Sequence, residues 1–148
     1  MTRLHLILIA AGGSAALLLG AFGFQMLGYQ PCAMCLWQRW PHVIGIALGL
    51  LAWKMGAKIW PAIGAVTMAV SAGLGIYHTG VERGFWEGPS SCTGSGLSSS
   101  DNLLSLEDVH VVLCDDVVWE LFGLSMASYN ALASLVFMAA WVMVLRRA

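Results

Sequence analysis

Charged side chains are scarce in this sequence. Only 10% of its 148 residues are Asp, Glu, Lys or Arg, whereas 59% are hydrophobic, and the mean hydropathy is +0.77. A soluble domain carries about 25% charged residues, so this composition excludes an ordinary water-soluble globule. The chain also lacks any run of basic residues, which excludes a nucleic-acid-binding surface of the usual kind. We therefore expect an integral membrane protein of one domain, residues 1–148, in contact with the lipid bilayer.

Acidic residues are absent from most of the chain, because all eight lie between Glu82 and Glu120. Three uncharged, apolar stretches outside that segment are long enough to cross the ~30 Å hydrocarbon core of a bilayer as helices. They lie at about residues 4–27, 59–81 and 121–145. The first also resembles a signal peptide, but it continues well beyond the about 7–15 apolar residues of such a peptide. We therefore expect it to be a retained helix.

A fourth apolar segment, at about residues 40–57, is shorter and contains Pro41. Its length fits a re-entrant or buried helix as well as a span. Proline is tolerated in the first turn of a helix, because its missing N–H has no partner there. If this segment does not span, the termini lie on opposite sides, and the side of the N-terminus carries two basic residues against five. If it spans, both termini lie on one side together with five basic residues, and two lie on the other side. The larger group is Arg3, Lys54, Lys58, Arg146 and Arg147, and the smaller is Arg39 and Arg83.

Cytoplasmic segments of membrane proteins carry an excess of Lys and Arg. This rule favours an all-α membrane protein, a four-transmembrane-helix bundle with both termini cytoplasmic. Two loops, residues 28–39 and 82–120, then face the same outer side and carry all four cysteines. Within the longer loop, the turn-rich stretch 88–96 is expected to be mobile. Residues 103–113 mix apolar and acidic side chains and predict a short helix lying on the membrane.

Cys32 and Cys35 form a Cys-x-x-Cys pair in the first outer loop. This spacing closes a small disulfide ring and can lower the pKa of one thiol, which suits redox chemistry, although zinc knuckles and structural cystines share it. Arg39 follows Cys35 by four residues, so on a helix the guanidinium lies on the same face as the sulfur. It is placed to stabilise a Cys35 thiolate, or negative charge on an electron acceptor at the bilayer edge. Interfacial anchoring is the alternative role for Arg39.

Cys92 and Cys114 lie in the second outer loop. A disulfide between them would stabilise the loop by about 3 kcal/mol on chain-entropy estimates. Its Gly- and Ser-rich surroundings also leave it open to a partner's thiolate. Four cysteines allow three pairings, and a four-thiolate zinc site would use all of them, but an oxidising compartment favours disulfides. Covalent c-type haem is excluded, because Leu36 rather than His follows Cys35.

His42 and His78 both lie near the outer ends of predicted spans. Each alone is an ordinary interfacial histidine. Together they suggest hydrogen bonds to a bound polar head group, or a pair of haem ligands.

The cysteine pattern and its flanking motifs resemble the disulfide bond formation protein B family, DsbB. The resemblance rests on residues 31–39 after the first span, on Cys92 and Cys114, and on residues 114–126 leading into the last span. It implies a multi-pass protein of the bacterial cell inner membrane with its redox loops in the periplasm. It also implies a set of catalytic cysteines and a quinone site, and no metal. The implied catalytic residues are Cys32, Cys35, Cys92 and Cys114, and the implied quinone contacts are Arg39, His42 and His78.

The resemblance further implies that the enzyme reoxidises a DsbA-like periplasmic oxidase of thioredoxin fold and passes the electrons to ubiquinone or menaquinone. In the implied relay, the partner's thiolate attacks Cys92, Cys114 then attacks Cys32, and Cys35 leaves as a thiolate. A vitamin K epoxide reductase-like enzyme is chemically close, but its Cys-x-x-Cys is expected within a late span rather than after the first.

Two readings from other functional classes stay open on the sequence. A membrane cytochrome would use His42 and His78 as haem ligands. A four-span scaffold would use its cystines only to stabilise the outer loops.

Overall fold

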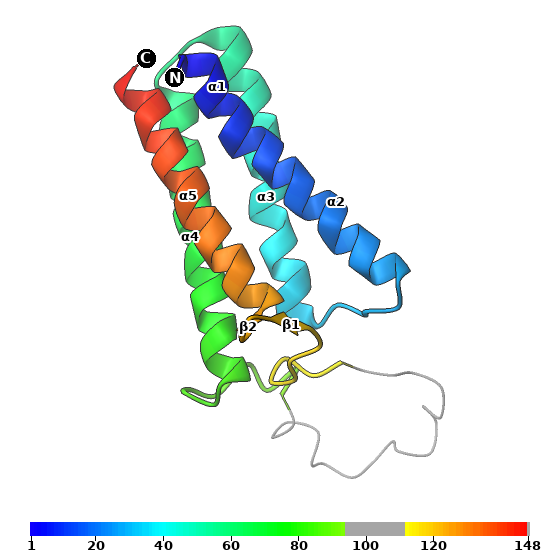
Figure 1. The fold of residues 1–148 in the computed structure, drawn as a ribbon. Coiled ribbons are helices and arrows are strands. Elements are labelled where there is room, and N and C mark those ends of the chain that lie inside the picture. Colours follow the sequence, from blue (N-terminus) through cyan, green and yellow to red (C-terminus); the bar gives the residue numbers. More distant parts are fainter. Residues whose placement is uncertain (94–111, 148) are drawn as a thin grey trace.

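A computed structural model describes residues 1–93 and 112–147, and its regular structure is almost entirely helical. Figure 1 shows long helices packed side by side into a bundle. Most of the predicted surface helix at 103–113 lies outside the described residues. The end of the turn-rich stretch 88–96, from residue 94 on, also lies outside them. The elements are α1 (Arg3–Ile7), the π-helical segment η1 (Leu8–Gly12), α2 (Gly13–Met26), α3 (Ala33–Met55), α4 (Ile59–Glu82), β1 (Glu120–Leu121), β2 (Leu124–Ser125) and α5 (Met126–Arg146).

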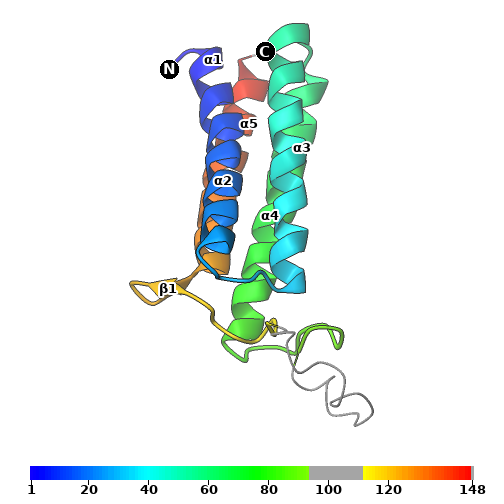
Figure 2. The same ribbon diagram turned by 90° about the vertical axis from the view of Figure 1, so that its right-hand side faces the viewer.

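Three helical segments in the described part of the chain are long and apolar enough to cross a membrane. They are Arg3–Met26, which joins α1, η1 and α2, then Ile59–Glu82 and Met126–Arg146. The prediction of a mostly helical membrane protein is therefore confirmed. α3 has 23 residues and runs beside the other helices in both views (Figures 1 and 2), but it carries two charged residues, Arg39 and Lys54. Whether α3 also spans stays a prediction.

Cys32 starts α3. Its backbone is extended, with φ −73° and ψ 172°, and its Sγ accepts a hydrogen bond from the backbone N–H of Cys35 at 3.2 Å. The helix therefore starts about two turns before residue 40, where the predicted span starts. Pro41 lies inside α3 and not in its first turn, which differs from the position expected from the sequence. A proline there removes one backbone hydrogen bond of the helix.

A hairpin precedes α5, so this helix starts five residues after the predicted span start at residue 121. β1 and β2 pair antiparallel, and Phe122 and Gly123 form the turn with φ of 52° and 73°. Glycine adopts this left-handed backbone without strain, which suits Gly123 to the turn. Ser125 then caps α5, since its Oγ accepts from the Ser128 N–H at 3.2 Å. The all-α prediction misses this small hairpin.

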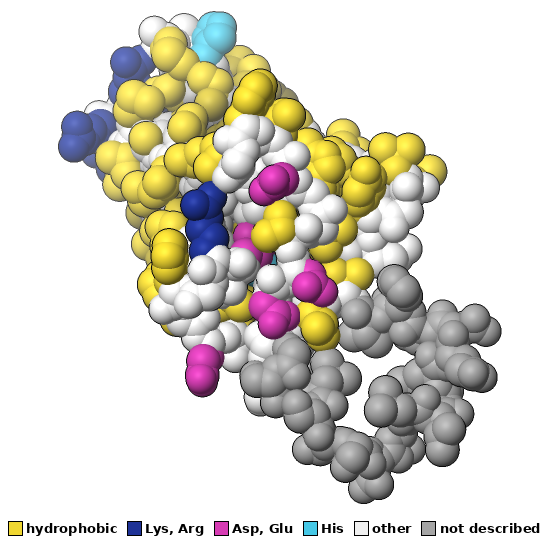
Figure 3. Space-filling model, turned by 60° about the horizontal axis from the view of Figure 1, so that its bottom comes forward, with side chains coloured by type: hydrophobic (Ala, Val, Ile, Leu, Met, Phe, Trp, Pro, Cys, Tyr) yellow, Lys and Arg dark blue, Asp and Glu magenta, His cyan; other side chains and the backbone are white. Residues whose placement is uncertain are grey.

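The two ends of the bundle differ in the charged residues that they carry and in the chain segments that lie there. Both chain termini lie at one end, and the start of α3, which carries the Cys-x-x-Cys pair, lies at the other (Figure 1). At the end with the termini, Arg147 donates to the carbonyl of Met1, and Arg3 donates to the carbonyl of Ala52 at 2.8 Å. Figure 3 looks toward the opposite end, where acidic side chains gather and apolar flanks surround them. We call this the cysteine-bearing end.

Small residues let α4 approach its neighbours closely. A Cβ at Gly64 would lie 2.7 Å from the Trp141 ring, and a Cβ at Gly75 would lie 2.9 Å from the Ala131 backbone nitrogen. Trp141 and Met68 are fully buried in the core that joins the helices. Without a hydrophobic driving force in lipid, such close backbone approach supplies much of the helix association.

We expect Gly75→Ala to loosen the packing of α4 on α5 and to lower the stability of the folded protein by about 1–3 kcal/mol, because the methyl group meets rigid backbone. Unfolding in detergent, followed by circular dichroism, measures this change. Gly73→Ala is the matched control, since nothing lies within 4 Å of a Cβ at that position. Alanine there should be neutral or slightly stabilising; equal losses at both positions would contradict the packing argument.

Candidate active site

The two thiols of the Cys-x-x-Cys pair lie together at the start of α3. Their sulfurs are 2.7 Å apart, with Cys32 buried and Cys35 partly buried. The hydrogen bond between the two sulfurs lowers the pKa of the Cys35 thiol and raises the pKa of Cys32. Cys35 therefore ionises first. Cys32 keeps its proton, and its S–H donates a hydrogen bond to the Cys35 sulfur.

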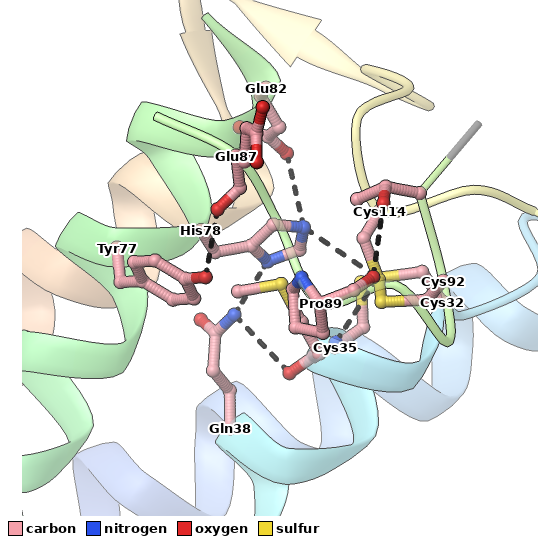
Figure 4. Close-up of a disulfide and its surroundings, with 12 residues drawn as sticks. Cys32, Cys35, Gln38, Tyr77, His78, Glu82, Glu87, Pro89, Cys92 and Cys114 are labelled. Atoms are coloured by element: carbon pink, nitrogen blue, oxygen red, sulfur yellow. Dashed lines mark hydrogen bonds and ion pairs between the residues drawn. A yellow bond between two sulfur atoms is a disulfide. The ribbon is translucent and has the colours of Figure 1, made fainter. Parts of the chain in front are cut away.

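His78 and Glu82 from α4 face this pair. His78 Nε2 is 3.6 Å from Cys32 Sγ and 3.7 Å from Glu82 Oε1 (Figure 4). The His78 side chain is 2% exposed, and the second carboxylate oxygen of Glu82 is buried without a hydrogen-bond partner among the described residues. A buried imidazole between a thiol and a carboxylate is an arrangement that can hold or move a proton at the Cys32 sulfur.

Cys92 and Cys114 form a disulfide, and Cys32 and Cys35 are free, so one of the three possible pairings is selected. The disulfide packs against Cys32, Met34 and Val81 in a small apolar cluster at the cysteine-bearing end. Figure 4 shows the four cysteines converging there. The sequence left open whether this pair only stabilises its loop or is accessible to a partner's thiolate; in the structure Cys92 is 4% and Cys114 0% exposed. Burial beside Cys32 favours exchange between the two pairs within the chain.

A cavity of about 420 Å³ opens beside the Cys-x-x-Cys pair. Its walls are mostly apolar, with residues of α2, α3, α4 and α5 and of the segments before α3 and α5. Its size is typical of small-molecule sites, which span about 300–1,000 Å³. In Figure 1, α2 diverges from α5 toward the cysteine-bearing end, where this cavity lies. Five of the seven predicted site residues line it, namely Cys32, Cys35, Arg39, His42 and His78.

Arg39 is held in the cavity wall by α2. Its guanidinium donates to Gln25 Oε1 at 2.9 Å and lies 4.9 Å from the centre of the Phe22 ring. Its positive charge also helps to lower the pKa of Cys35. A fixed cation beside a thiolate and an apolar cavity can stabilise negative charge on either side of it.

His42 lies deeper in the bundle than the thiols. Its Nε2 is 2.7 Å from Asn130 Oδ1, and its Nδ1 is 3.2 Å from Ser14 Oγ. In His78, Nδ1 is 2.7 Å from Gln38 Nε2 and Nε2 faces Cys32. Since both nitrogens of both rings already have side-chain partners, this arrangement weighs against a pair of haem ligands.

The donor atoms of Cys32, Cys35 and His78 all lie within 4.8 Å of one another, which is close enough to consider a metal ion. Two thiolates on one tetrahedral zinc stand about 3.8 Å apart, given Zn–S bonds of about 2.3 Å. The observed 2.7 Å separation of the sulfurs is nearer to a disulfide. The alternative of a four-thiolate zinc site does not fit either, because Cys92 and Cys114 are bonded to each other.

Three residues at the site were not predicted from the sequence: Gln38, Glu82 and Asn130. Gln38 follows Cys35 by three residues, which places it on the same helical face. Asn130 is a side-chain amide inside an otherwise apolar stretch, and polar groups at such positions are usually functional. Glu82 is the first acidic residue after the third stretch. The sequence therefore contains a feature that marks each of these residues, but no such feature indicates which side chain the residue contacts.

Comparison with known proteins agrees with this geometry. The family model described as disulfide bond formation protein DsbB matches residues 3–144. Disulfide bond formation protein B of Chromobacterium violaceum is 35% identical over 79 residues, which are 50% of this chain and 46% of that protein. An uncharacterized protein of Rickettsia prowazekii is 27% identical over 114 residues, 72% of this chain and 66% of that protein. The chain thus matches less than two thirds of the length of either relative, and no solved structure gives a significant match.

Proposed function

The chain belongs to the disulfide bond formation protein DsbB family, and from this premise we propose that it reoxidises a DsbA-like periplasmic oxidase and passes the electrons to a membrane quinone. Family membership makes it a membrane oxidoreductase that supports disulfide formation. One observation carries the rest of the proposal: a Cys-x-x-Cys pair lies between a buried disulfide and an apolar cavity. One side of the pair suits a protein disulfide, and the other suits a lipid-soluble oxidant.

The proposed topology follows from the charges at the two ends. Both termini and the basic residues near them face the cytoplasm, and the cysteine-bearing end faces the periplasm, as the positive-inside rule favours. α3 is then the fourth span, with Arg39 near one interface and Lys54 near the other. This orientation in a bacterial inner membrane places the disulfide where a soluble periplasmic partner can reach it.

The proposed relay consists of thiol–disulfide exchanges and starts with Cys32 and Cys35 joined as a disulfide. The partner's thiolate attacks Cys92, which breaks the Cys92–Cys114 bond and releases Cys114 as a thiolate. Cys114 then attacks Cys32, so that a Cys114–Cys32 bond forms and Cys35 leaves with the electron pair. The contact of the Cys92–Cys114 disulfide with Cys32 supports this second step, because little movement is needed.

The second half of the relay oxidises the partner. Its second thiolate attacks its own sulfur in the bond to Cys92, so the partner leaves as a disulfide and Cys92 as a thiolate. Cys92 attacks Cys114, which reforms their disulfide and releases Cys32. The partner has then lost two electrons, and Cys32 and Cys35 hold them as thiols.

The cavity fits a quinone head group, because it is apolar, of suitable volume and bordered by Cys35. Arg39 would hold the polar edge of that group, and His42 and His78 line the same cavity. A bound ubiquinone or menaquinone supplies a two-electron, two-proton oxidant. The chain contributes a low-pKa thiolate at Cys35, a cation at Arg39 and a wall that excludes water.

Anaerobic mixing of the purified protein with a reduced DsbA-like protein and a short-chain ubiquinone tests the proposed function. We expect loss of quinone absorbance with oxidation of one partner dithiol per quinone. Cys35→Ser should abolish quinone reduction, because the second thiol is needed to complete the electron transfer. Haem absorbance in the purified protein would instead support the cytochrome. Absence of quinone reduction, with no catalytic property lost on treatment with a reducing agent, would support the scaffold.

A partner that lacks its second cysteine should accumulate as a stable adduct on Cys92, because nothing then resolves the mixed disulfide. In the same adduct, Cys114 should be joined to Cys32 and Cys35 should become reactive to alkylation. Peptide mapping by mass spectrometry identifies each bond. Cys92→Ser is the control and should give no adduct; an adduct on Cys35 would reverse the proposed direction of electron flow.

Arg39→Ala should slow quinone reduction by about ten- to hundred-fold, because one hydrogen bond to a charged group contributes about 1.5–3 kcal/mol. Arg39→Lys should be milder, since it keeps the cation without the planar fork. Stopped-flow kinetics with the short-chain quinone measures both variants. Arg83→Ala is the control: that cation also lies at the cysteine-bearing end, but it is exposed and donates to the Gly123 carbonyl. If Arg39→Ala weakens partner binding alone, Arg39 belongs to the protein interface.

A further inference from the structure

A continuous chain of buried and partly buried hydrogen bonds links three helices to the Cys-x-x-Cys pair. His42 Nε2 lies 2.7 Å from Asn130 Oδ1, Asn130 Nδ2 lies 2.7 Å from Gln38 Oε1, and Gln38 Nε2 lies 2.7 Å from His78 Nδ1. Gln38 is 6% exposed, and His42 and His78 are 2% exposed. His42 and Gln38 come from α3, His78 from α4 and Asn130 from α5. The relay described above uses neither Asn130 nor Gln38.

The amides give this chain a direction, because an amide nitrogen only donates and an amide oxygen only accepts. Gln38 Nε2 faces two acceptors, His78 Nδ1 and the Met34 carbonyl oxygen at 3.4 Å. Turning the Gln38 amide would bring its oxygen against the Met34 oxygen, which is unfavourable. His78 Nδ1 therefore accepts, and the His78 proton resides on Nε2, the nitrogen that faces Cys32.

Every donor in the chain then points the same way. His42 donates to Asn130, Asn130 to Gln38, Gln38 to His78, and His78 Nε2–H to Cys32 Sγ. The Cys32 thiol in turn donates to Cys35, the sulfur that ionises first. Hydrogen bonds aligned in this way polarise one another where the local dielectric is low.

We propose that Asn130 is a positioning residue that sets the direction of this chain and holds the His78 proton on Nε2, so that the chain ends as a donor to the Cys35 thiolate. Without Asn130, the Gln38 amide loses the partner of its oxygen and turns more freely. His78 is then unprotonated at Nε2 for part of the time, and this nitrogen accepts a hydrogen bond from the Cys32 thiol. Cys35 loses its donor, and its thiolate is destabilised. The inference deepens the proposed function, in which Cys35 is the sulfur that delivers electrons.

The competing explanation is that these polar groups only join helices, as buried amides and hydroxyls often do in membrane bundles. Both explanations predict that removal of Asn130 lowers stability. Only the positioning role predicts a change in the position of the His78 proton. The tautomer of His78 therefore distinguishes the two explanations.

Two measurements on reduced, quinone-free protein in detergent test the inference. Nitrogen-15 NMR of histidine-labelled protein shows which ring nitrogen carries the proton, and the His78 signal is identified by its loss in His78→Gln. The pH dependence of alkylation at Cys35, located by mass spectrometry, reports its ionisation. The titratable and charged groups that line the cavity with Cys35 are Tyr29, Cys32, Arg39, His42, His78, Glu82, Asp116 and Tyr129, and Asn130→Leu keeps all of them.

In the unmodified protein, the proton of neutral His78 should reside on Nε2. In Asn130→Leu, the Nε2–H form should fall to roughly one half, because the tautomer is set mainly by the partner of the other nitrogen. The midpoint for Cys35 alkylation should rise by about one pH unit, as expected when a hydrogen bond to a charged group is partly lost.

Thr79→Val is the matched control, because it removes a partly buried hydroxyl contact between α4 and α5 that is not part of the hydrogen-bond chain. In this contact Thr79 Oγ1 lies 3.1 Å from Ser128 Oγ. It should change neither the tautomer nor the midpoint. An unchanged tautomer in Asn130→Leu would overturn the proposal and leave Asn130 a packing role. If Asn130→Leu does not fold, the unmodified protein still decides, since a His78 proton on Nδ1 contradicts the proposal. Neither readout needs a quinone or a partner, so failure of the proposed oxidase activity leaves them intact.

Discussion

The contact between Cys32 and His78 is the interaction on which the rest of the site depends. It joins the start of α3 to the end of α4, two segments 46 residues apart, inside an apolar bundle. A sulfur and an imidazole buried together must find hydrogen-bond partners among their neighbours, because Cys32 and His78 are only 3% and 2% exposed. Gln38 therefore holds the far side of the imidazole, and Cys35 holds the far side of the sulfur. The two thiols are unequal because the hydrogen bond between their sulfurs lowers the pKa of Cys35 and raises that of Cys32.

That inequality gives the site a direction. Both thiols line the apolar cavity, but the buried disulfide packs against Cys32, and the cation at Arg39 helps to lower the pKa of Cys35. A chain with equivalent thiols would have no reason to accept electrons at one sulfur and release them at the other. Here the hydrogen bond from Cys32 and the positive charge of Arg39 both favour negative charge on Cys35. The membrane location matters equally, since a lipid-soluble oxidant and a soluble protein approach from different phases.

The same polar residues also link the helices. Ser14, Gln38, His42, Ser71 and His78 are buried on three different helices, and they are hydrogen-bonded to side chains or to backbone. In lipid, such bonds add to association that rests mainly on close packing, as at Gly64 and Gly75. A bundle held in this way can tolerate the cavity beside α2, because the tight contacts lie elsewhere. Stability and site geometry therefore draw on one set of interactions.

The sequence by itself determined the class of the protein and its chemistry, because scarcity of charge, long apolar stretches and the Cys-x-x-Cys spacing are properties of composition and local order. A helical membrane protein and its family are confirmed on that basis. The local sequence also indicated Arg39, His42 and His78 as candidate site residues, and all three line the cavity. It missed the hairpin at Glu120–Ser125 and the early start of α3, since both depend on how the cysteine-bearing end packs.

Only the tertiary structure decided which groups meet. Cys32 and His78, or Gln38 and Asn130, are separated by 46 and 92 residues, and no periodicity or spacing relates such positions. The pairing of Cys92 with Cys114 and the burial of their disulfide were open for the same reason. Helical patterns fix which face of one helix is apolar, but the register between helices is set by side chains that interlock across them. The direction of the hydrogen-bond chain is a property of that register, and so it appears only when all the helices are in place.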